Sequence, residues 1–306
     1  MCLLARVSVG KLFRIEYLYL TAAGILWGSG HPVIRYILGA GDRHMNSLHI
    51  AFLSTCIGMV MLVMVMTPSH RLSSLWKLGR RGLAIAGAAG GLQYGLYPIL
   101  SYTALSFIPA SLNAIIVGSS PILIALLSRA LLDERLRLVS YAGIALAFTG
   151  LVLLVGGYGG GPVSVVGTSL SALGALVASL YAVAGRYLMR SYDALSISLL
   201  GALIGSLLLA YVTYAVSGLD GIMTSSPTDL ALVAYWGVAV TTGNLLFYLS
   251  LKRMKAVGAG AFFFVSPVAA ATLSIIFLGE PLTATVVLGM AAALVGVRLT
   301  QLGIAK

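Results

Sequence analysis

The chain has 306 residues, of which 59% are hydrophobic and only 9% are charged, and its formal net charge is +11. A soluble domain carries about 25% charged residues, so this composition excludes an ordinary soluble protein and predicts an all-α polytopic membrane protein. The basic residues lie in short segments between apolar runs, which favours the lipid headgroup layer over nucleic acid as their partner.

The apolar runs predict the helices. A spanning helix requires about 20 mainly apolar residues. The first run is longer than a signal-peptide core and ends in His31-Pro32 rather than a cleavage site, so we expect a retained helix there. Ten runs meet the criterion, and their connections are too short for a separate soluble domain: 15–38, 46–66, 82–106, 109–130, 137–156, 163–188, 194–216, 229–250, 256–278 and 282–301.

The Lys and Arg residues predict the orientation of these runs. Alternate connections and the two ends of the chain hold all but two of the 19 basic residues, and the exceptions are Arg35 and Arg43. Because cytoplasmic connections are enriched in Lys and Arg, both termini are expected in the cytoplasm, with the protein in the plasma (inner) membrane.

An internal repeat divides the chain in two. Residues 102–154 return 146 positions later as residues 248–300, without a gap. Each half then holds five helices, so the second half begins on the opposite side of the membrane and is inverted. We therefore predict a first five-helix repeat over 1–156, a Gly-rich external linker over 157–162 and a second, inverted five-helix repeat over 163–306. The matched pairs include Tyr102 and Tyr248, Pro121 and Pro267, Glu134 and Glu280, Gly143 and Gly289, and Gly150 and Gly296.

These residues also carry a resemblance to a known family. The first helix contains Leu26-Trp27-Gly28-Ser29, the fourth carries Pro-Ala-Ser-Leu-Asn-Ala from Pro109, and the acids and glycines of the repeat follow in both halves. This pattern resembles the drug/metabolite transporter superfamily, specifically its ten-helix EamA-type branch. The resemblance implies two five-helix halves around a central cavity that opens alternately to either side. Tyr181 stands where many relatives carry Trp.

The first helix offers the first candidate binding residues. Trp27, His31 and Arg35 are spaced four residues apart and share one face. Strongly polar groups at membrane depth are costly, so each is a candidate for substrate binding. The alternative is that Arg35 extends to the outer headgroups and His31 bonds to a backbone carbonyl.

The third and eighth helices present equivalent faces. Tyr94 and Tyr97 lie on one face of the third, and the repeat offset places Trp236 and Asn244 on the matching face of the eighth. An inverted repeat brings equivalent faces together, so we expect both to look into the cavity. Packing between helices is the alternative for these aromatic residues, and it is the reading we favour for Tyr102, Tyr211 and Tyr214.

Three further candidates complete the predicted substrate site. Asn113 in the fourth helix needs a hydrogen-bond partner in hydrocarbon, which substrate or a neighbouring helix could supply. Phe263 belongs to an apolar cluster in the ninth helix that could line a pocket or face lipid, and Tyr181 lies in the sixth helix.

Enzyme signatures are absent from the sequence. There is no Gly-x-Ser-x-Gly, no phosphate-binding Gly-rich loop followed by Lys-Ser/Thr, and no His-Glu-x-x-His. We predict no catalytic residue, metal or cofactor. Asp133 and Glu134 lie among Arg129, Arg135 and Arg137, which favours a structural ion-pair network.

The sequence therefore predicts a transporter that moves a small amphipathic metabolite by alternating access, with an amino acid or similar solute as the leading class and with export favoured. One alternative is an exchanger of organic anions or phosphorylated metabolites, in which Arg35 and Arg186 would pair with the anion. A non-transporting membrane enzyme or scaffold is a third reading. The pattern predicts no oligomeric state, and a monomer is compatible with it.

Overall fold

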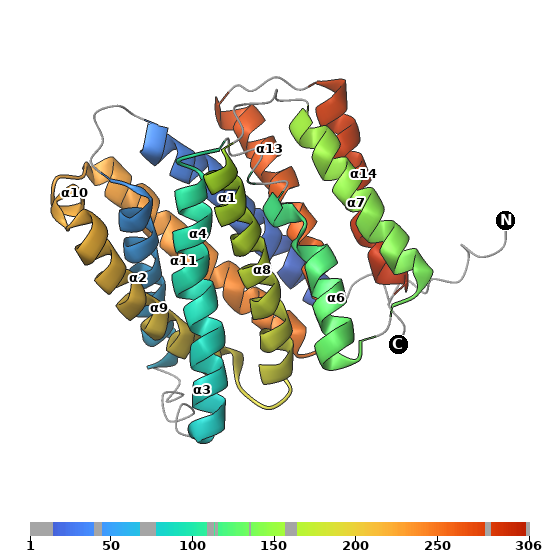
Figure 1. Ribbon diagram of the computed structural model, residues 1–306, viewed down its shortest axis with the longest axis horizontal. Helices are drawn as coiled ribbons and strands as arrows, with labels where there is room; N and C mark the ends of the chain where they lie inside the picture. The colour runs from blue at the N-terminus through green and yellow to red at the C-terminus, as the bar shows by residue number, and fades with distance from the viewer. Residues whose placement is uncertain are drawn as a thin grey trace.

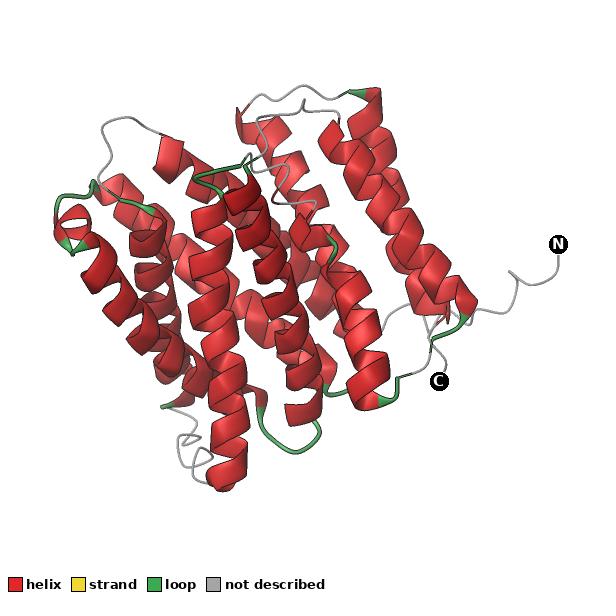
Figure 2. Cartoon of the chain, viewed as in Figure 1, coloured by secondary structure: helices red, strands yellow, loops and turns green. Residues whose placement is uncertain are grey.

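The computed structural model describes residues 15–39, 45–67, 78–108, 113, 116–134, 136–156, 164–278 and 283–303. Every regular element within these ranges is a helix (Figure 2). The predicted linker over 157–162, and Glu280 of the repeat, lie outside the described residues.

The first half of the chain forms α1 (Ile15–Gly39), α2 (Ser47–Met66), α3 (Gly79–Gly90), a π-helix (Gly91–Leu96), α4 (Tyr97–Ala104), α6 (Ser120–Leu132) and α7 (Leu138–Gly156). The second half forms α8 (Val165–Leu188), α9 (Ala194–Ser217), the short α10 (Asp220–Met223), α11 (Pro227–Leu251), α12 (Ala256–Gly260), a 3₁₀-helix (Ala261–Phe264), α13 (Val265–Leu278) and α14 (Ala284–Gly303). Figure 1 shows them as one bundle.

Among the described residues, seven segments are long and apolar enough to cross a membrane: Ser47–Met66, Gly79–Ala104, Val165–Leu188, Ala194–Ser217, Pro227–Leu251, Ala256–Leu273 and Ala284–Gly303. Two shorter apolar helices cover Ile116–Leu132 and Leu138–Leu153. Each of the ten predicted runs overlaps a described helix, and the all-helical membrane class is confirmed. The count of ten spanning helices and the inversion of the halves stay predictions.

Pro98 explains the interruption of the third predicted helix. Proline has no N–H, so the carbonyl of Tyr94, four residues earlier, loses its α-helical partner. The Thr55 hydroxyl donates to that carbonyl at 3.3 Å, and the Tyr97 N–H reaches back five residues to Leu92 O. The chain therefore forms a π-helix over Gly91–Leu96, and α4 continues after it.

Glycine allows two close helix contacts. Gly205 of α9 lies against Tyr94, where an added Cβ would stand 2.6 Å from the Tyr94 carbonyl carbon. α7 and α14 lie side by side (Figure 1). Gly143 meets Gly296 and Gly150 meets Gly289, so these two helices run in opposite directions. Small residues let the backbones approach without lipid between them.

The helices of the two halves pack across one another rather than separately. α1 packs on α11 and α13, while α8 packs on α4 and α6. α2 packs on α9 and α11, and α9 packs in turn on α3 and the π-helix. These contacts leave a cavity between α1, α2, the π-helix, α4, α8, α11 and α13.

Candidate functional site

A cavity of about 110 Å³ lies among the helices of both halves. Its described lining contains aromatic rings, hydroxyl groups and amides, with His31 from α1. No Asp, Glu, Lys or Arg belongs to the described lining. The cavity therefore suits a solute with an apolar or aromatic part and an uncharged polar part.

Three side chains from three helices meet at a polar node. The Trp27 ring N–H donates to Asn244 Oδ1 at 3.1 Å, and Gln93 Nε2 donates to the same oxygen at 3.3 Å. Trp27 comes from α1, Gln93 from the π-helix and Asn244 from α11. This node joins the first helix to the equivalent faces of the two halves.

A second pair of contacts fixes the wall beside the node. The Trp236 ring N–H donates to the Tyr102 hydroxyl at 2.9 Å. Gly30 of α1 leaves room for the Trp236 ring, because an added Cβ would overlap it. Trp236 and Tyr102 are 5% and 6% exposed, so both rings are held by packing as well as by the hydrogen bond.

Asn113 finds its partners on neighbouring helices. Its Oδ1 accepts from the Ser171 hydroxyl of α8 at 2.7 Å, and its Nδ2 points to the Ser101 hydroxyl of α4 at 3.5 Å. The amide also lines the cavity and is 1% exposed. Its contacts therefore tie α4 to α8, as the helix-partner alternative predicted.

Aromatic rings form one end of the cavity. Trp27 lies 5.6 Å from Phe247 and 5.1 Å from Phe263 between ring centroids, and Tyr181 stacks on Phe247 at 5.9 Å. Tyr17 stacks on Phe262 one layer further toward the first turn of α1. Of these rings, Trp27, Tyr181 and Phe263 line the cavity.

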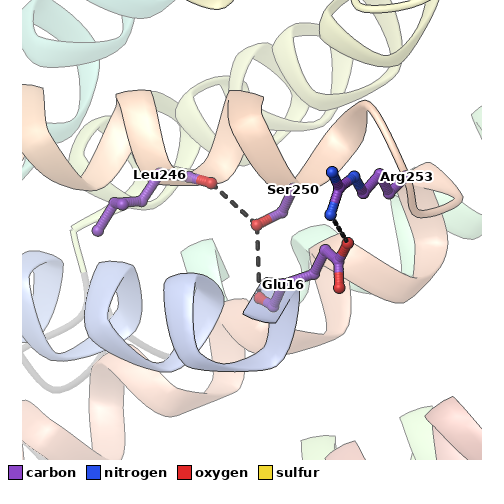
Figure 3. Close-up of polar contacts among 4 residues, drawn as sticks. All are labelled: Glu16, Leu246, Ser250 and Arg253. Carbon is purple, nitrogen blue, oxygen red and sulfur yellow. Dashed lines mark hydrogen bonds and ion pairs between the residues drawn. The ribbon is translucent and has the colours of Figure 1, made fainter. Parts of the chain in front are cut away.

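Ion pairs lie beyond the aromatic layer, and two of them involve buried glutamates. Glu16, in the first turn of α1, pairs with Arg253 at 3.3 Å, and the Ser250 hydroxyl donates to the Glu16 carbonyl at 3.4 Å and to Leu246 O at 2.9 Å (Figure 3). Arg253 is exposed whereas Glu16 is buried. This contact joins α1 to the end of α11.

The second ion pair is buried more completely. Glu134, between α6 and α7, lies 3.6 Å from Arg186 of α8 and accepts the Ala256 N–H at 3.2 Å. Arg186 also donates to the Leu251 carbonyl. Burial raises the pKa of the Glu134 carboxyl, while the Ala256 N–H and the Arg186 charge oppose that shift. Within the described residues Glu134 pairs with Arg186 of α8. The sequence instead favoured an ion-pair network with Arg129, Arg135 and Arg137, which lie close to Glu134 in the chain.

The structure brings most of the predicted site residues to one place. Arg35 lies on α1 one turn beyond His31, and its side chain is outside the described residues. The other candidates all line the cavity: Trp27, His31, Tyr94, Tyr97, Asn113, Tyr181, Trp236, Asn244 and Phe263. Their role in binding stays a prediction.

Sequence reasoning missed several lining residues, and Gln93 and Tyr102 are the two that take part in the hydrogen bonds above. Gln93 follows directly before Tyr94 in the π-helix, and both side chains are buried and line the cavity. Tyr102 was assigned to packing, but it lines the cavity through its contact with Trp236.

Comparison with known proteins bears out the resemblance. The EamA-like transporter family matches residues 14–156 and again residues 165–302. Similar proteins include "Uncharacterized transporter YvbV" of Bacillus subtilis, 27% identical over 87% of this chain and 85% of that protein. An "Uncharacterized transporter" of Archaeoglobus fulgidus is 22% identical over 92% of this chain and 97% of that protein.

A crystal structure has the same fold, with a TM-score of 0.74 at 21% identity over 94% of this chain and 96% of that chain. The family and the relatives named as transporters indicate a membrane transporter rather than an enzyme, acting on a small molecule in a lipid environment. The chain is an integral membrane protein and belongs to the EamA-like transporter family.

Proposed function

We propose that this protein transports a small amphipathic metabolite, with an amino acid or a similar solute as the leading class, by alternating access and with export favoured. The cavity is the observation that carries the proposal. Its lining combines rings such as Tyr97 and Trp236 with amides and hydroxyl groups, and both halves of the chain contribute to it. Such a lining matches a solute with an apolar part and a polar head.

The proposed architecture is ten spanning helices in two inverted halves, within the plasma (inner) membrane and with both termini in the cytoplasm. The helix contacts support it. The contact of α1 with α11 corresponds, after the shift of 146 positions, to the contact of α8 with α4, and α7 corresponds to α14. The opposite directions of α7 and α14 are those that inversion requires.

Alternating access needs a barrier that can open on each side of the cavity. The aromatic layer and the ion pairs of Glu16 and Glu134 separate the cavity from the end that the basic residues assign to the cytoplasm. In the proposed cycle this arrangement is closed to the cytoplasm, and these contacts separate when the cavity opens there.

The alternative of an organic-anion exchanger loses one of its two arginines. Arg186 pairs with Glu134 beyond the aromatic layer and does not line the cavity. A solute carrying net negative charge would meet no Lys or Arg among the described lining residues. No observation favours a membrane enzyme or a scaffold over a transporter.

Substrate counterflow in proteoliposomes tests the proposal, after a thermal-stabilisation screen of the purified protein with the 20 common amino acids selects the solute. Tyr97→Ala and Trp236→Ala are expected to abolish counterflow while the protein remains folded, since each removes a ring from the cavity lining. Tyr214→Ala is the matched control, because this ring on α9 is 70% exposed. Counterflow that survives both cavity substitutions would contradict the proposed site, and a wild-type protein that neither binds nor moves any amino acid would exclude the leading class.

A further inference from the structure

Two buried amides lie side by side in the cavity lining. Gln93 and Asn244 are 9% and 1% exposed, and both line the cavity. One hydrogen bond joins them, from Gln93 Nε2 to Asn244 Oδ1 at 3.3 Å. Two amides placed side by side can form two such bonds, so this pair leaves part of its capacity unused.

Trp27 fixes the orientation of both amides. The indole N–H is only a donor, and it donates to Asn244 Oδ1 at 3.1 Å. A rotated Asn244 would turn its NH₂ group toward that donor. With Asn244 held in its observed orientation, a rotated Gln93 would place its own oxygen against Asn244 Oδ1, and two acceptors would face each other. The observed orientation is therefore the one in which the hydrogen bonds among Trp27, Gln93 and Asn244 can all form at once.

This orientation leaves one acceptor and one donor free. Gln93 Oε1 and Asn244 Nδ2 have no hydrogen-bond partner among the described residues. The Tyr94 hydroxyl lies close enough to interact with the Asn244 and Ser198 side chains, but it is too distant or too poorly aligned to complete a hydrogen bond with either. Leaving buried polar atoms unpaired is costly, so a ligand that supplies both partners gains from satisfying them.

The charge of the lining restricts what that ligand presents. None of the described lining residues is Lys, Arg, Asp or Glu. A carboxylate or an ammonium group of a ligand in the cavity would therefore have no group of opposite charge beside it. A neutral group that offers one donor and one acceptor side by side meets both conditions. Carboxamides and the lactam-type edges of heterocycles have this pattern.

We propose that Gln93 and Asn244 recognise the polar head of the substrate, and that this head is an uncharged amide edge attached to an apolar or aromatic body. The inference rests on the proposed transport function but replaces its leading class, because an amino acid would bring a carboxylate and an ammonium group into a cavity whose described lining holds no charged partner. Gln93 Oε1 accepts from the amide N–H, and Asn244 Nδ2 donates to the amide carbonyl. Trp27 acts as a positioning residue, because it holds Asn244 in the orientation that recognition requires.

Two pairs of probes that differ in little but this edge test the inference. The purified full-length protein is mixed with benzamide or benzoate, and with nicotinamide or nicotinate, and its unfolding temperature in detergent is measured. We expect both amides to raise the unfolding temperature and both carboxylates to leave it nearly unchanged. N,N-dimethylbenzamide lacks the amide N–H donor, and its affinity is expected to be lower than that of benzamide by a factor of roughly ten or more.

Substitutions assign the effect to the amide pair. Gln93→Met keeps the approximate volume but removes both polar atoms, and it should weaken benzamide binding roughly ten-fold or more. Gln301→Met is the matched control: Gln301 bonds to the Gly258 carbonyl outside the cavity, so benzamide binding should remain. A Trp27→Phe protein should lose the preference for benzamide over N,N-dimethylbenzamide, which a purely structural tryptophan would not affect.

The inference is wrong if neither amide stabilises the protein, if benzoate stabilises it as well as benzamide does, or if Gln93→Met binds benzamide with unchanged affinity. These failures are distinct from failure of the proposed function. Counterflow of an amino acid that depends on Trp236, together with no response to the amides, would overturn the amide inference and leave the transport function standing.

Discussion

The prediction about proton coupling rests on a single histidine. A proton-driven carrier needs a group in its cavity that changes charge near neutral pH, which is the ordinary role of histidine, and His31 is the histidine among the described lining residues. No described carboxylate lines the cavity.

We therefore predict facilitated exchange without tight proton coupling. In proteoliposomes without a pH gradient, internal unlabelled substrate should drive accumulation of labelled substrate, and a protonophore should leave this counterflow unchanged. Strict dependence on an imposed pH gradient, lost in His31→Ala but kept in His49→Ala, would instead make His31 the coupling site. His49 suits the comparison because it accepts the Asn46 N–H and contacts the Gly218 carbonyl, away from the cavity lining.

Glu134 predicts a pH dependence of stability. Burial raises its pKa in the folded protein above the ordinary 4.5, so the fold favours the protonated carboxyl more than the unfolded chain does. The corresponding stability is fully present below pH 4.5 and is lost as pH rises through the folded-state pKa. The unfolding temperature in detergent should therefore fall as the pH rises from 4.5 through the folded-state pKa of Glu134.

Glu134→Gln should flatten this part of the pH profile, because glutamine does not titrate but can still accept the Ala256 N–H. Asp220→Asn in the short α10 is the control, and it should leave the slope unchanged. An identical slope in the wild-type and Glu134→Gln proteins would show that another group is responsible.

At the level of a single helix, Pro98 determines the backbone hydrogen bonding of the third predicted helix. Pro98→Ala restores an N–H that can bond to Tyr94 O in α-helical geometry, and this would displace the Thr55 hydroxyl and remove the reason for the π-helix. Gln93 would then rotate relative to Tyr94. We expect Pro98→Ala to lose transport while expression and folding persist.

The matched control is Pro227→Ala, because Pro227 occupies the first turn of α11, where the missing N–H costs no helical bond. Thr55→Val should lower the free energy of unfolding by about 1 kcal/mol, since it removes one hydrogen bond to the freed carbonyl. Full transport in Pro98→Ala would show that the π-helix does not position the site.

Helical spacing predicted one stripe of each lining helix, but not how wide a face that helix presents to the cavity. Spacing of four residues placed Trp27 and His31 together, and the repeat matched the faces around Tyr97 and Trp236, because an α-helix has a fixed period. Gln93 was missed because it lies next to Tyr94 in sequence and not one turn away, and both neighbours line the cavity. The pairing of Glu134 with Arg186 was also out of reach, since it depends on how α6 and α8 pack rather than on neighbours in sequence.

At the scale of the whole molecule, the predicted orientation can be tested by labelling single cysteines from outside the cell, in a background without Cys2 and Cys56. Gly160→Cys and Asp220→Cys should react with a membrane-impermeant maleimide, because the basic residues assign the opposite connections to the cytoplasm. Arg80→Cys and Lys252→Cys should not react until the membrane is opened. Labelling of both Arg80→Cys and Gly160→Cys from outside would overturn the inverted topology.

The contact between α7 and α14 has a consequence for how the two halves recognise each other. No residue described in either helix lines the cavity, yet Gly143 and Gly150 of one helix meet Gly296 and Gly289 of the other. The last helix of each half thus packs against the last helix of the other half. This contact joins the halves together with the contacts of α1 with α11 and of α8 with α6. Assembly then depends on surfaces rather than on continuity of the backbone, so residues 1–156 and 163–306, made as two separate polypeptides, should find each other in the membrane and restore a working carrier.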